Sequence, residues 1–257
     1  MDSSPGYREF APGDAFRKEI HCLWISVIPP AGGEPAPVLP DACTDLIWQS
    51  GVGAFVAGPD TGPAPAGGPP GSVFVGARFR PGAGGAALGV PLSELLDQRV
   101  GVADLAEVPG QRLPGSLPPA EAMRRMAGVA AQLVTERPAD RLVLHAARLL
   151  ARPGARAEDV ADLLGIGERQ LRRRCQAAVG YGPRMLARVL RFRRFVSRID
   201  AAAACGVTPD LAWMAAETGY ADQAHLTRES ARLAGLTPAL LARARRAAAH
   251  PGQGAVR

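Results

Sequence analysis

Charged side chains that could contact nucleic acid share one face of a predicted helix in the second half of the chain. Residues 168–178 predict a helix with Leu171 and Cys175 on its buried side. The opposite side then carries, at spacings of one, four and five residues, Glu168, Arg169, Arg172 and Arg173. An arginine can donate two parallel hydrogen bonds to a guanine edge, which a lysine cannot match. The face therefore suits a nucleic-acid contact, and the alternative is a solvated helix face without a partner.

A second predicted helix, residues 222–234, carries a less charged version of this face. If Leu226 is buried, the side chains left on the opposite face are Gln223, Ala224, Thr227 and Arg228. Asp222 is placed to cap this helix, and the free N–H groups at a helix start favour a phosphate. Gln223 is therefore a candidate for either a phosphate or a base contact, whereas Ala224 can touch only a thymine methyl group.

Both helices follow a turn signal that is typical of helix-turn-helix units. A small residue precedes a glycine by four positions in each case, as Ala161 precedes Gly165 and Ala215 precedes Gly219. The small residue permits a close crossing of the two helices, and glycine tolerates the unusual backbone angles of the turn. One such spacing recurs by chance in an alanine-rich chain. Two in order, 54 residues apart with a long predicted helix between them, form a strong signal.

The chain from Asp140 onward is predicted to be helical throughout. Glycine and proline separate helices that are expected near residues 140–151, 157–164, 168–178, 183–199, 209–218, 222–234 and 238–249. Thr208 before Pro209 and Thr237 before Pro238 are the expected start signals of two of them. The helix over 183–199 would hold the two recognition helices about one DNA turn, roughly 34 Å, apart.

Two segments carry a resemblance to AraC-family transcription regulators. Residues 160–174, VADLLGIGERQLRRR, are similar to the first DNA-reading half of that family, and residues 219–238, GYADQAHLTRESARLAGLTP, are similar to the second. The resemblance implies a sequence-specific DNA-binding protein with two helix-turn-helix units. It also implies base or phosphate contacts for Arg169, Arg172, Arg173, Ala224 and Arg228.

The sequence departs from the family pattern at the end of each recognition helix. An inward phenylalanine is usual there, and this chain has Cys175 and Ser230 instead. Loss of a core aromatic side chain costs on the order of 3–5 kcal/mol if nothing refills the space. Trp213 and Tyr220 are the bulky neighbours that could compensate at the second position. The departures leave open a degenerate regulator that acts mainly through protein partners.

The first hundred residues predict a β-rich domain. Apolar, β-branched or aromatic runs at 20–28, 45–49, 54–56 and 73–79 are separated by glycine and proline, a loop is expected over 58–71, and Pro91 starts a short helix. Residues 39–47, LPDACTDLI, and 76–82, GARFRPG, resemble the partly cupin-like N-terminal domain of many AraC-type regulators. That resemblance implies a domain that senses a small effector or mediates dimer contacts.

Several aromatic and charged side chains of this domain are candidates for an effector pocket. The set consists of Trp24, Asp41, Asp45, Trp48, Phe55, Phe74 and Arg78. The alternative is that the aromatic residues belong to an ordinary β-sheet core. A metal site of the cupin kind needs about three clustered His or Glu ligands, and this region has only His21, so neither a metal nor another cofactor is expected.

The predicted fold class is α+β with two domains, and the distribution of charge supports the division. Residues 1–137 carry a formal charge of −4 and residues 138–257 one of +10, which suggests that the second part faces an anionic polymer. We expect a sensing domain over 1–118, a connecting helix over 119–137, an all-helical DNA-binding domain over 138–250 and a flexible tail over 251–257. The connecting helix could pack on its own domain or pair with a second subunit.

Other classes of protein are not supported. No clustered nucleophile and base predicts a catalytic site, since His21 and Cys22 are adjacent on a strand and point to opposite faces. Residues 22–28, the most apolar stretch, are too short to span a membrane, and the N-terminus lacks a signal-peptide pattern, so a cytoplasmic location is the default. The four cysteines form no metal or disulfide pattern. Cys43 is the candidate reactive thiol, which leaves open an alkyl-accepting or redox sensor coupled to DNA binding.

The expected partner is double-stranded DNA at an operator or promoter. RNA polymerase, a small-molecule effector and a second copy of the chain are further candidate partners.

Overall fold

The computed structural model describes residues 6–30 and 37–249. The expected tail at 251–257 lies outside the described residues. Within them, a six-stranded antiparallel sheet dominates the N-terminal part, and the C-terminal part contains helices and their connections only. The predicted order, a β-rich domain before an all-helical domain, is confirmed.

The sheet has the strand order β1-β2-β5-β3-β4-β6, and its neighbouring strands are antiparallel. The strands are β1 (Gly6–Phe10), β2 (Ile20–Val27), β3 (Thr44–Gln49), β4 (Gly53–Ala57), β5 (Val73–Phe79) and β6 (Arg99–Gly101). The four inner strands are those that the sequence predicts. β1 and β6 form the two edges and lack a sequence signal, because β1 is exposed along its whole length and β6 has only three residues.

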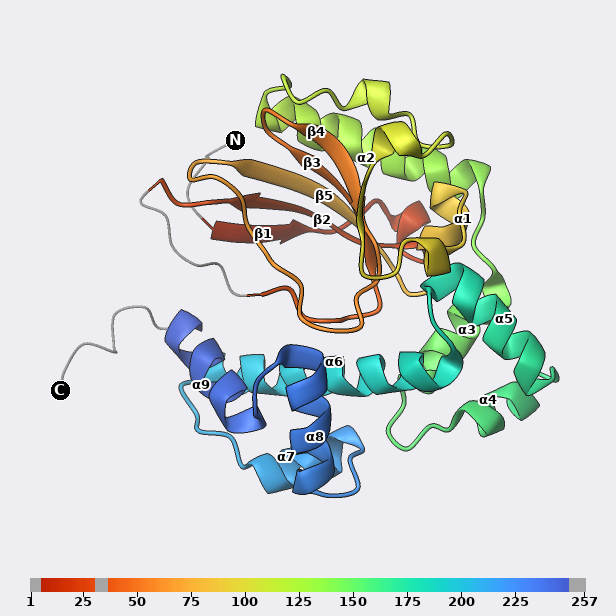
Figure 1. Ribbon diagram of the computed structural model, residues 1–257, viewed down its shortest axis with the longest axis vertical. Coiled ribbons are helices and arrows are strands. Elements are labelled where there is room, and N and C mark those ends of the chain that lie inside the picture. The colour runs from red at the N-terminus through yellow and green to blue at the C-terminus, as the bar shows by residue number, and fades with distance from the viewer. Residues whose placement is uncertain (1–5, 31–36, 250–257) are drawn as a thin grey trace.

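Side chains of β3 alternate between the two faces of the sheet. Leu46 and Trp48 are fully buried in one core with Met126 of α2 (Pro119–Glu136), while Ile47 belongs to a separate cluster on the other face. α2 covers the first face of the sheet (Figure 1). The helix that the sequence predicts between the two domains therefore packs on the sheet of its own chain.

The helical part is built around the long helix α6. Its helices are α3 (Arg141–Leu150), α4 (Ala157–Leu163), α5 (Glu168–Val179), α6 (Pro183–Ala204), α7 (Leu211–Thr218), α8 (Gln223–Ala234) and α9 (Pro238–Ala249). α7 and α8 lie on the side of α6 that is remote from the sheet (Figure 1). α6 continues five residues beyond its predicted end at Ile199, because the alanines at 201–204 favour helix after the apolar stripe has ended.

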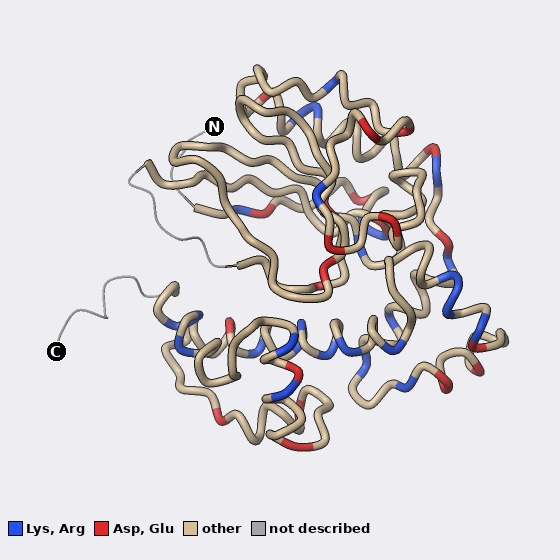
Figure 2. The backbone as a smooth tube through the Cα atoms, in the orientation of Figure 1, with Lys and Arg blue, Asp and Glu red and all other residues tan. Residues whose placement is uncertain are grey.

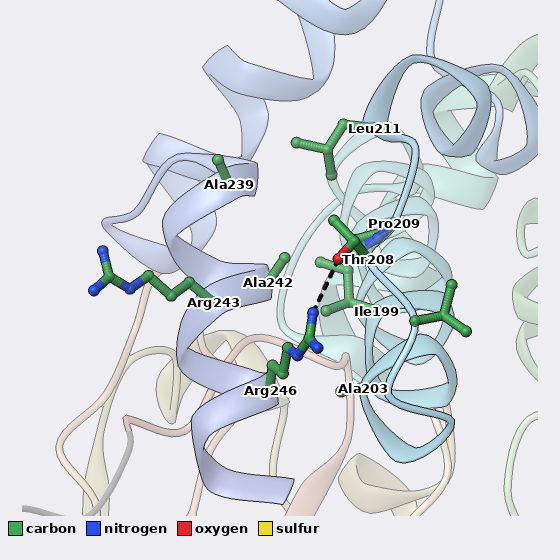
Figure 3. Close-up of a pocket in the computed structure, with 10 residues that line it drawn as sticks. Ile199, Ala203, Thr208, Pro209, Leu211, Ala239, Ala242, Arg243 and Arg246 are labelled. Carbon is green, nitrogen blue, oxygen red and sulfur yellow. Dashed lines mark hydrogen bonds between the residues drawn. The ribbon is translucent and has the colours of Figure 1, made fainter. Parts of the chain in front are cut away.

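The start of α7 differs from the predicted start. Asp210, and not Thr208, caps the helix, because its carboxylate accepts hydrogen bonds from the backbone N–H groups of Ala212 and Trp213 at 3.0 Å each. Thr208 instead accepts a hydrogen bond from Arg246 of α9 at 2.9 Å (Figure 3). This contact lies at a crevice of about 260 Å³ between α9 and the end of α6. Thr208 thus ties the last helix to the loop that precedes α7.

The sheet domain and the helical domain share a packed junction. Ala42, which precedes β3, is buried in the core of the helical domain, whereas Leu144 of α3 is buried in the core of the sheet domain. α1 (Gly84–Leu88) contacts α5 so closely that a Cβ on Gly85 would lie 2.7 Å from the α5 backbone. Residues Leu92–Glu94, where the sequence predicts a short helix, form one 3-10 turn, which also contacts α5. α5, the first predicted recognition helix, therefore packs against the N-terminal domain.

Candidate nucleic-acid interface

The first helix-turn-helix unit consists of α4 and α5. Gly165 turns the chain between them with a φ of +64°, in the left-handed region that favours glycine. Ala161 is 1% exposed where the two helices approach each other, and Leu171 and Cys175 of α5 are fully buried. These four residues take the places that the sequence predicts for them. Together they determine which side of α5 faces outward.

The outward side of α5 carries all four predicted contact residues. Glu168, Arg169, Arg172 and Arg173 are exposed. Within residues 6–30 and 37–249, these three arginines form no ion pair and no side-chain hydrogen bond. The next arginine, Arg174, is turned toward the domain and donates to Asp140 at 2.6 Å. The outward guanidinium groups therefore keep their donors for an external partner.

The second unit consists of α7 and α8, and its turn follows the same plan. Gly219 has a φ of +87°, and the N–H of Tyr220 donates to the carbonyl of Ala215 at 2.9 Å. Asp222 caps α8, because its carboxylate accepts a hydrogen bond from the backbone N–H of His225 at 2.6 Å. The predicted cap of the second recognition helix is confirmed.

α8 turns a smaller polar surface outward than α5 does. Leu226 is fully buried, which leaves Gln223, Ala224 and Arg228 exposed, as predicted. Thr227 is half-buried, and its hydroxyl donates to the carbonyl of Gln223 at 2.8 Å. The threonine oxygen therefore remains available only as an acceptor, and Arg228 supplies the one guanidinium group among the four predicted contacts of α8.

The two departures from the family pattern are accommodated in different ways. Cys175 is fully buried, and burial raises the pKa of its thiol to about 12. Ser230 is also fully buried, and its hydroxyl donates to the carbonyl of Leu236 at 2.8 Å. The suggestion that Trp213 fills the second space is wrong, because its side chain is 52% exposed. Tyr220 is buried and packs edge-on against the histidine of α8, with 5.2 Å between the ring centroids.

Positive charge recurs along the helical part. Figure 2 shows Lys and Arg residues at intervals along α5, α6 and α9. Residues 138–257 carry a formal charge of +10. A positive field of this kind attracts polyanions at long range.

A cavity of about 400 Å³ lies on the face of the sheet opposite α2. Six of the seven candidate effector residues line it, namely Trp24, Asp41, Asp45, Phe55, Phe74 and Arg78. The assignment of Trp48 to this pocket is wrong. Trp48 is fully buried beneath α2, where its indole N–H donates to the carbonyl of Pro114 at 2.9 Å. Since successive strand residues alternate between faces, Trp48 lies opposite Asp45, three positions earlier.

The cavity also has lining residues that the sequence did not indicate. Tyr7 comes from β1 and Arg99 from β6, the two edge strands without a sequence signal. Residues 65–67 of the loop between β4 and β5 line it as well, although the sequence places that loop outside any packed element. Over 6–30 and 37–249, no three His, Cys, Asp or Glu side chains are grouped to hold a metal ion. None of the helices in these ranges has the length and apolar character needed to cross a membrane.

Solved structures of ToxT from Vibrio cholerae resemble the chain at low similarity. The crystal structure of ToxT from V. cholerae O395 has 11% sequence identity and a TM-score of 0.43, covering 85% of this chain and 95% of that chain. The structure of wild-type ToxT from strain SCE256 with a bound unsaturated fatty acid has 11% identity and a TM-score of 0.39, covering 92% and 93%.

Family comparisons match two segments of the chain. No curated protein matches its sequence. Residues 8–101 match a family described as a domain of unknown function, DUF6597. Residues 160–244, which hold both turns and both recognition helices, match a family described as a helix-turn-helix domain. Residues 160–244 thus carry an AraC-type helix-turn-helix domain, as the sequence predicts.

Proposed function

We propose that this chain is a sequence-specific DNA-binding transcription regulator whose DNA binding responds to a small molecule held in the N-terminal cavity. The observation that carries the proposal is the pair of recognition helices, each with a buried leucine and an exposed polar side. The contacts to bases and phosphates would come from Glu168, Arg169, Arg172 and Arg173 of α5 and from Gln223, Ala224, Thr227 and Arg228 of α8. The chain would act by binding and not by catalysis.

The turn at residues 41–43 offers a route from the cavity to the DNA-binding domain. Asp41 and Cys43 line the cavity, while Ala42 between them is buried in the helical core with a φ of +66°. A non-glycine residue in the left-handed region is under backbone strain, so packing on both sides must hold this turn in place. A ligand that displaces Asp41 or Cys43 would therefore shift the contact with the helical domain. The proposed functional division is a sensing domain over 1–118, a connecting helix over 119–137 and a DNA-binding domain over 138–250.

The same role would involve two further partners. A regulator that activates transcription contacts RNA polymerase, and one that reads a symmetric operator pairs with a second copy of itself. Analytical ultracentrifugation of the full chain, alone and with a selected duplex, would give the number of copies bound. Capture of purified RNA polymerase on that complex would test the first contact.

A second candidate function is a regulator that acts mainly through protein partners, and the small polar surface of α8 favours it. Titration of a labelled mixed-sequence duplex with the full chain at two salt concentrations distinguishes the two. A reader with six to ten phosphate contacts should lose roughly 10³–10⁵ in affinity between 50 and 200 mM salt. Absent binding at the lower salt concentration, or binding that does not weaken with salt, would favour the second candidate.

A further inference from the structure

The cavity of the N-terminal domain has largely apolar walls. Its volume of about 400 Å³ lies within the range of small-molecule sites, roughly 300–1,000 Å³. Trp24, Phe55 and Phe74 line it from three different strands, together with two isoleucines. A Cβ on Gly76 of β5 would come within 2.2 Å of the Trp24 ring, so the glycine makes room for the indole against the sheet. Such walls fit an apolar ligand body.

The guanidinium group of Arg78 lies among three acidic side chains. Its Nε lies 3.1 and 3.2 Å from the two carboxylate oxygens of Asp45, and its Nη1 lies 3.6 Å from Asp41 and 3.9 Å from Glu9. Burial opposes the charge of Arg78, but Asp45 and Asp41 raise the pKa of the guanidinium group. Three carboxylates therefore surround one fixed cation at this end of the cavity.

The other cation that lines the cavity is paired as well. Arg99 donates to the two carboxylate oxygens of Asp60 at 3.0 and 2.9 Å. Among the described lining residues, both guanidinium groups thus have carboxylate partners, and acidic groups outnumber basic ones. An anionic ligand would have to compete with these carboxylates and would meet their repulsion.

Aromatic rings stand next to the acidic end. The indole N–H of Trp24 donates to Asp45 at 2.7 Å, and the rings of Trp24 and Tyr7 lie 5.8 Å apart. Tyr7 in turn donates to Glu9 at 2.7 Å. Aromatic faces attract cations, and they do so most strongly where water is excluded. Rings and carboxylates at one end, with an apolar wall beyond, are complementary to a positive group on an apolar body.

From this combination we infer that the cavity binds an organic cation, an amine or quaternary ammonium group carried on an apolar body. The inference rests on the proposed function, because it names the class of effector that the sensing domain would take. The ammonium group would lie by Asp41 and Asp45, where it balances the excess negative charge. The apolar body would lie against Phe55 and Phe74.

Three probes with a phenyl ring on a short alkyl chain test the charge preference of the full-length chain by isothermal titration calorimetry. They are 3-phenylpropylamine, 3-phenylpropan-1-ol and 3-phenylpropanoate, which differ mainly in the charge of the end group. We expect the amine to bind about tenfold more tightly than the alcohol, and the carboxylate to bind most weakly. A carboxylate that binds as tightly as the amine, or an amine that does not bind at about 1 mM, would overturn the inference.

A charge-removing variant locates the site. Asp41→Asn keeps an oxygen that can accept the hydrogen bond from the N–H of Cys43, 2.8 Å in the native chain, but removes a negative charge from the cavity. It should lower the advantage of the amine over the alcohol several-fold. Asp14→Asn removes the same charge at an exposed position outside the cavity and should leave that ratio unchanged. Equal ratios for wild type and Asp41→Asn would contradict the assigned site.

Failure of this inference can be told apart from failure of the proposed function. Amine binding by a chain that selects no DNA sequence would leave the cation site standing and remove the regulator. Selection of a DNA sequence by a chain without a preference for the amine would support the regulator and rule out the cation site.

Discussion

Arg191 of α6 lies over the ring of Tyr220, with its guanidinium carbon 4.9 Å from the ring centroid. The same guanidinium group donates to Glu229 of α8 at 2.9 Å, and Arg188 donates to the same carboxylate oxygen at 3.0 Å. Glu229 is 6% exposed, and these two arginines are ion-pair partners of its buried carboxylate. The contacts connect the second recognition helix to α6 and thereby hold the side of α8 that carries Arg228 facing outward.

Replacing Glu229 by glutamine should lower the free energy of unfolding by about 1.5–3 kcal/mol, because two charge-assisted hydrogen bonds lose their charged acceptor. Urea unfolding monitored by circular dichroism measures the change. Glu217→Gln is the matched control, since the carboxylate of Glu217 is 45% exposed and lies 3.8 Å from Arg198. Glu217→Gln should lower the free energy of unfolding by no more than about 0.5 kcal/mol. Equal costs for the two variants would show that the buried contact does not hold α8.

Two glycine-to-alanine variants should change stability in opposite directions. At Gly85 a Cβ would lie 2.7 Å from the backbone of α5, so Gly85→Ala should destabilise the chain by about 1–3 kcal/mol. At Gly128, in the exposed middle of α2, a Cβ would meet nothing within 4 Å. Gly128→Ala should therefore stabilise the chain by about 0.5–1 kcal/mol through helix propensity. Thermal unfolding gives both signs, and a stabilising Gly85→Ala would mean that α1 and α5 are not in contact in solution.

Cys43 is expected to resist alkylation in the folded chain. Burial, and secondarily Asp41, raise the pKa of its thiol well above the ordinary value, and the thiolate is the reactive form. Cys205 is exposed and should react first. Brief treatment with iodoacetamide at neutral pH, followed by peptide mass mapping, should find the adduct on Cys205 alone. Modification of Cys43 at the rate of Cys205 would support the alkyl-accepting sensor that the sequence left open.

The helical domain could be predicted closely because its signals are local. Helical periodicity alone places Leu171 on the buried side of α5 and Arg172 on the exposed side. Gly165 and Gly219 mark the two turns, because both turns need a positive φ that glycine adopts readily. The start of α7 differs from the sequence prediction because two capping signals compete there. Thr208 precedes a proline, but Asp210 makes the cap.

The cavity could be predicted only in part because it is assembled across strands. Asp45 and Trp48 are three positions apart in β3, so alternation alone separates them, and this signal was available in the sequence. Tyr7 and Arg99 join the site through the pairing of edge strands that are too polar or too short to be recognised. The acidic excess around Arg78 depends on the register that brings Asp45 beside it.

Alanine substitutions on the recognition helices should weaken specific DNA binding. Arg172→Ala and Arg228→Ala should each make the free energy of binding to the preferred duplex less favourable by about 1–3 kcal/mol. Each should also relax the sequence preference of the protein. Fluorescence anisotropy at constant salt measures both effects. Arg124→Ala, on the exposed side of α2 and 71% exposed, is the control and should bind like wild type. Wild-type affinity in both recognition-helix variants would mean that the reading faces are assigned wrongly.

Selection of bound sequences from a random duplex pool by the full-length chain tests the central claim most directly. Two recognition helices joined by α6 predict an enriched site with two short elements about one helical turn apart, roughly 10–10.5 base pairs. Arg228→Ala should reduce the base enrichment within one element, and Arg172→Ala should reduce it within the other. A pool that stays random after repeated rounds, with binding that depends only on salt, would contradict sequence-specific reading by this chain.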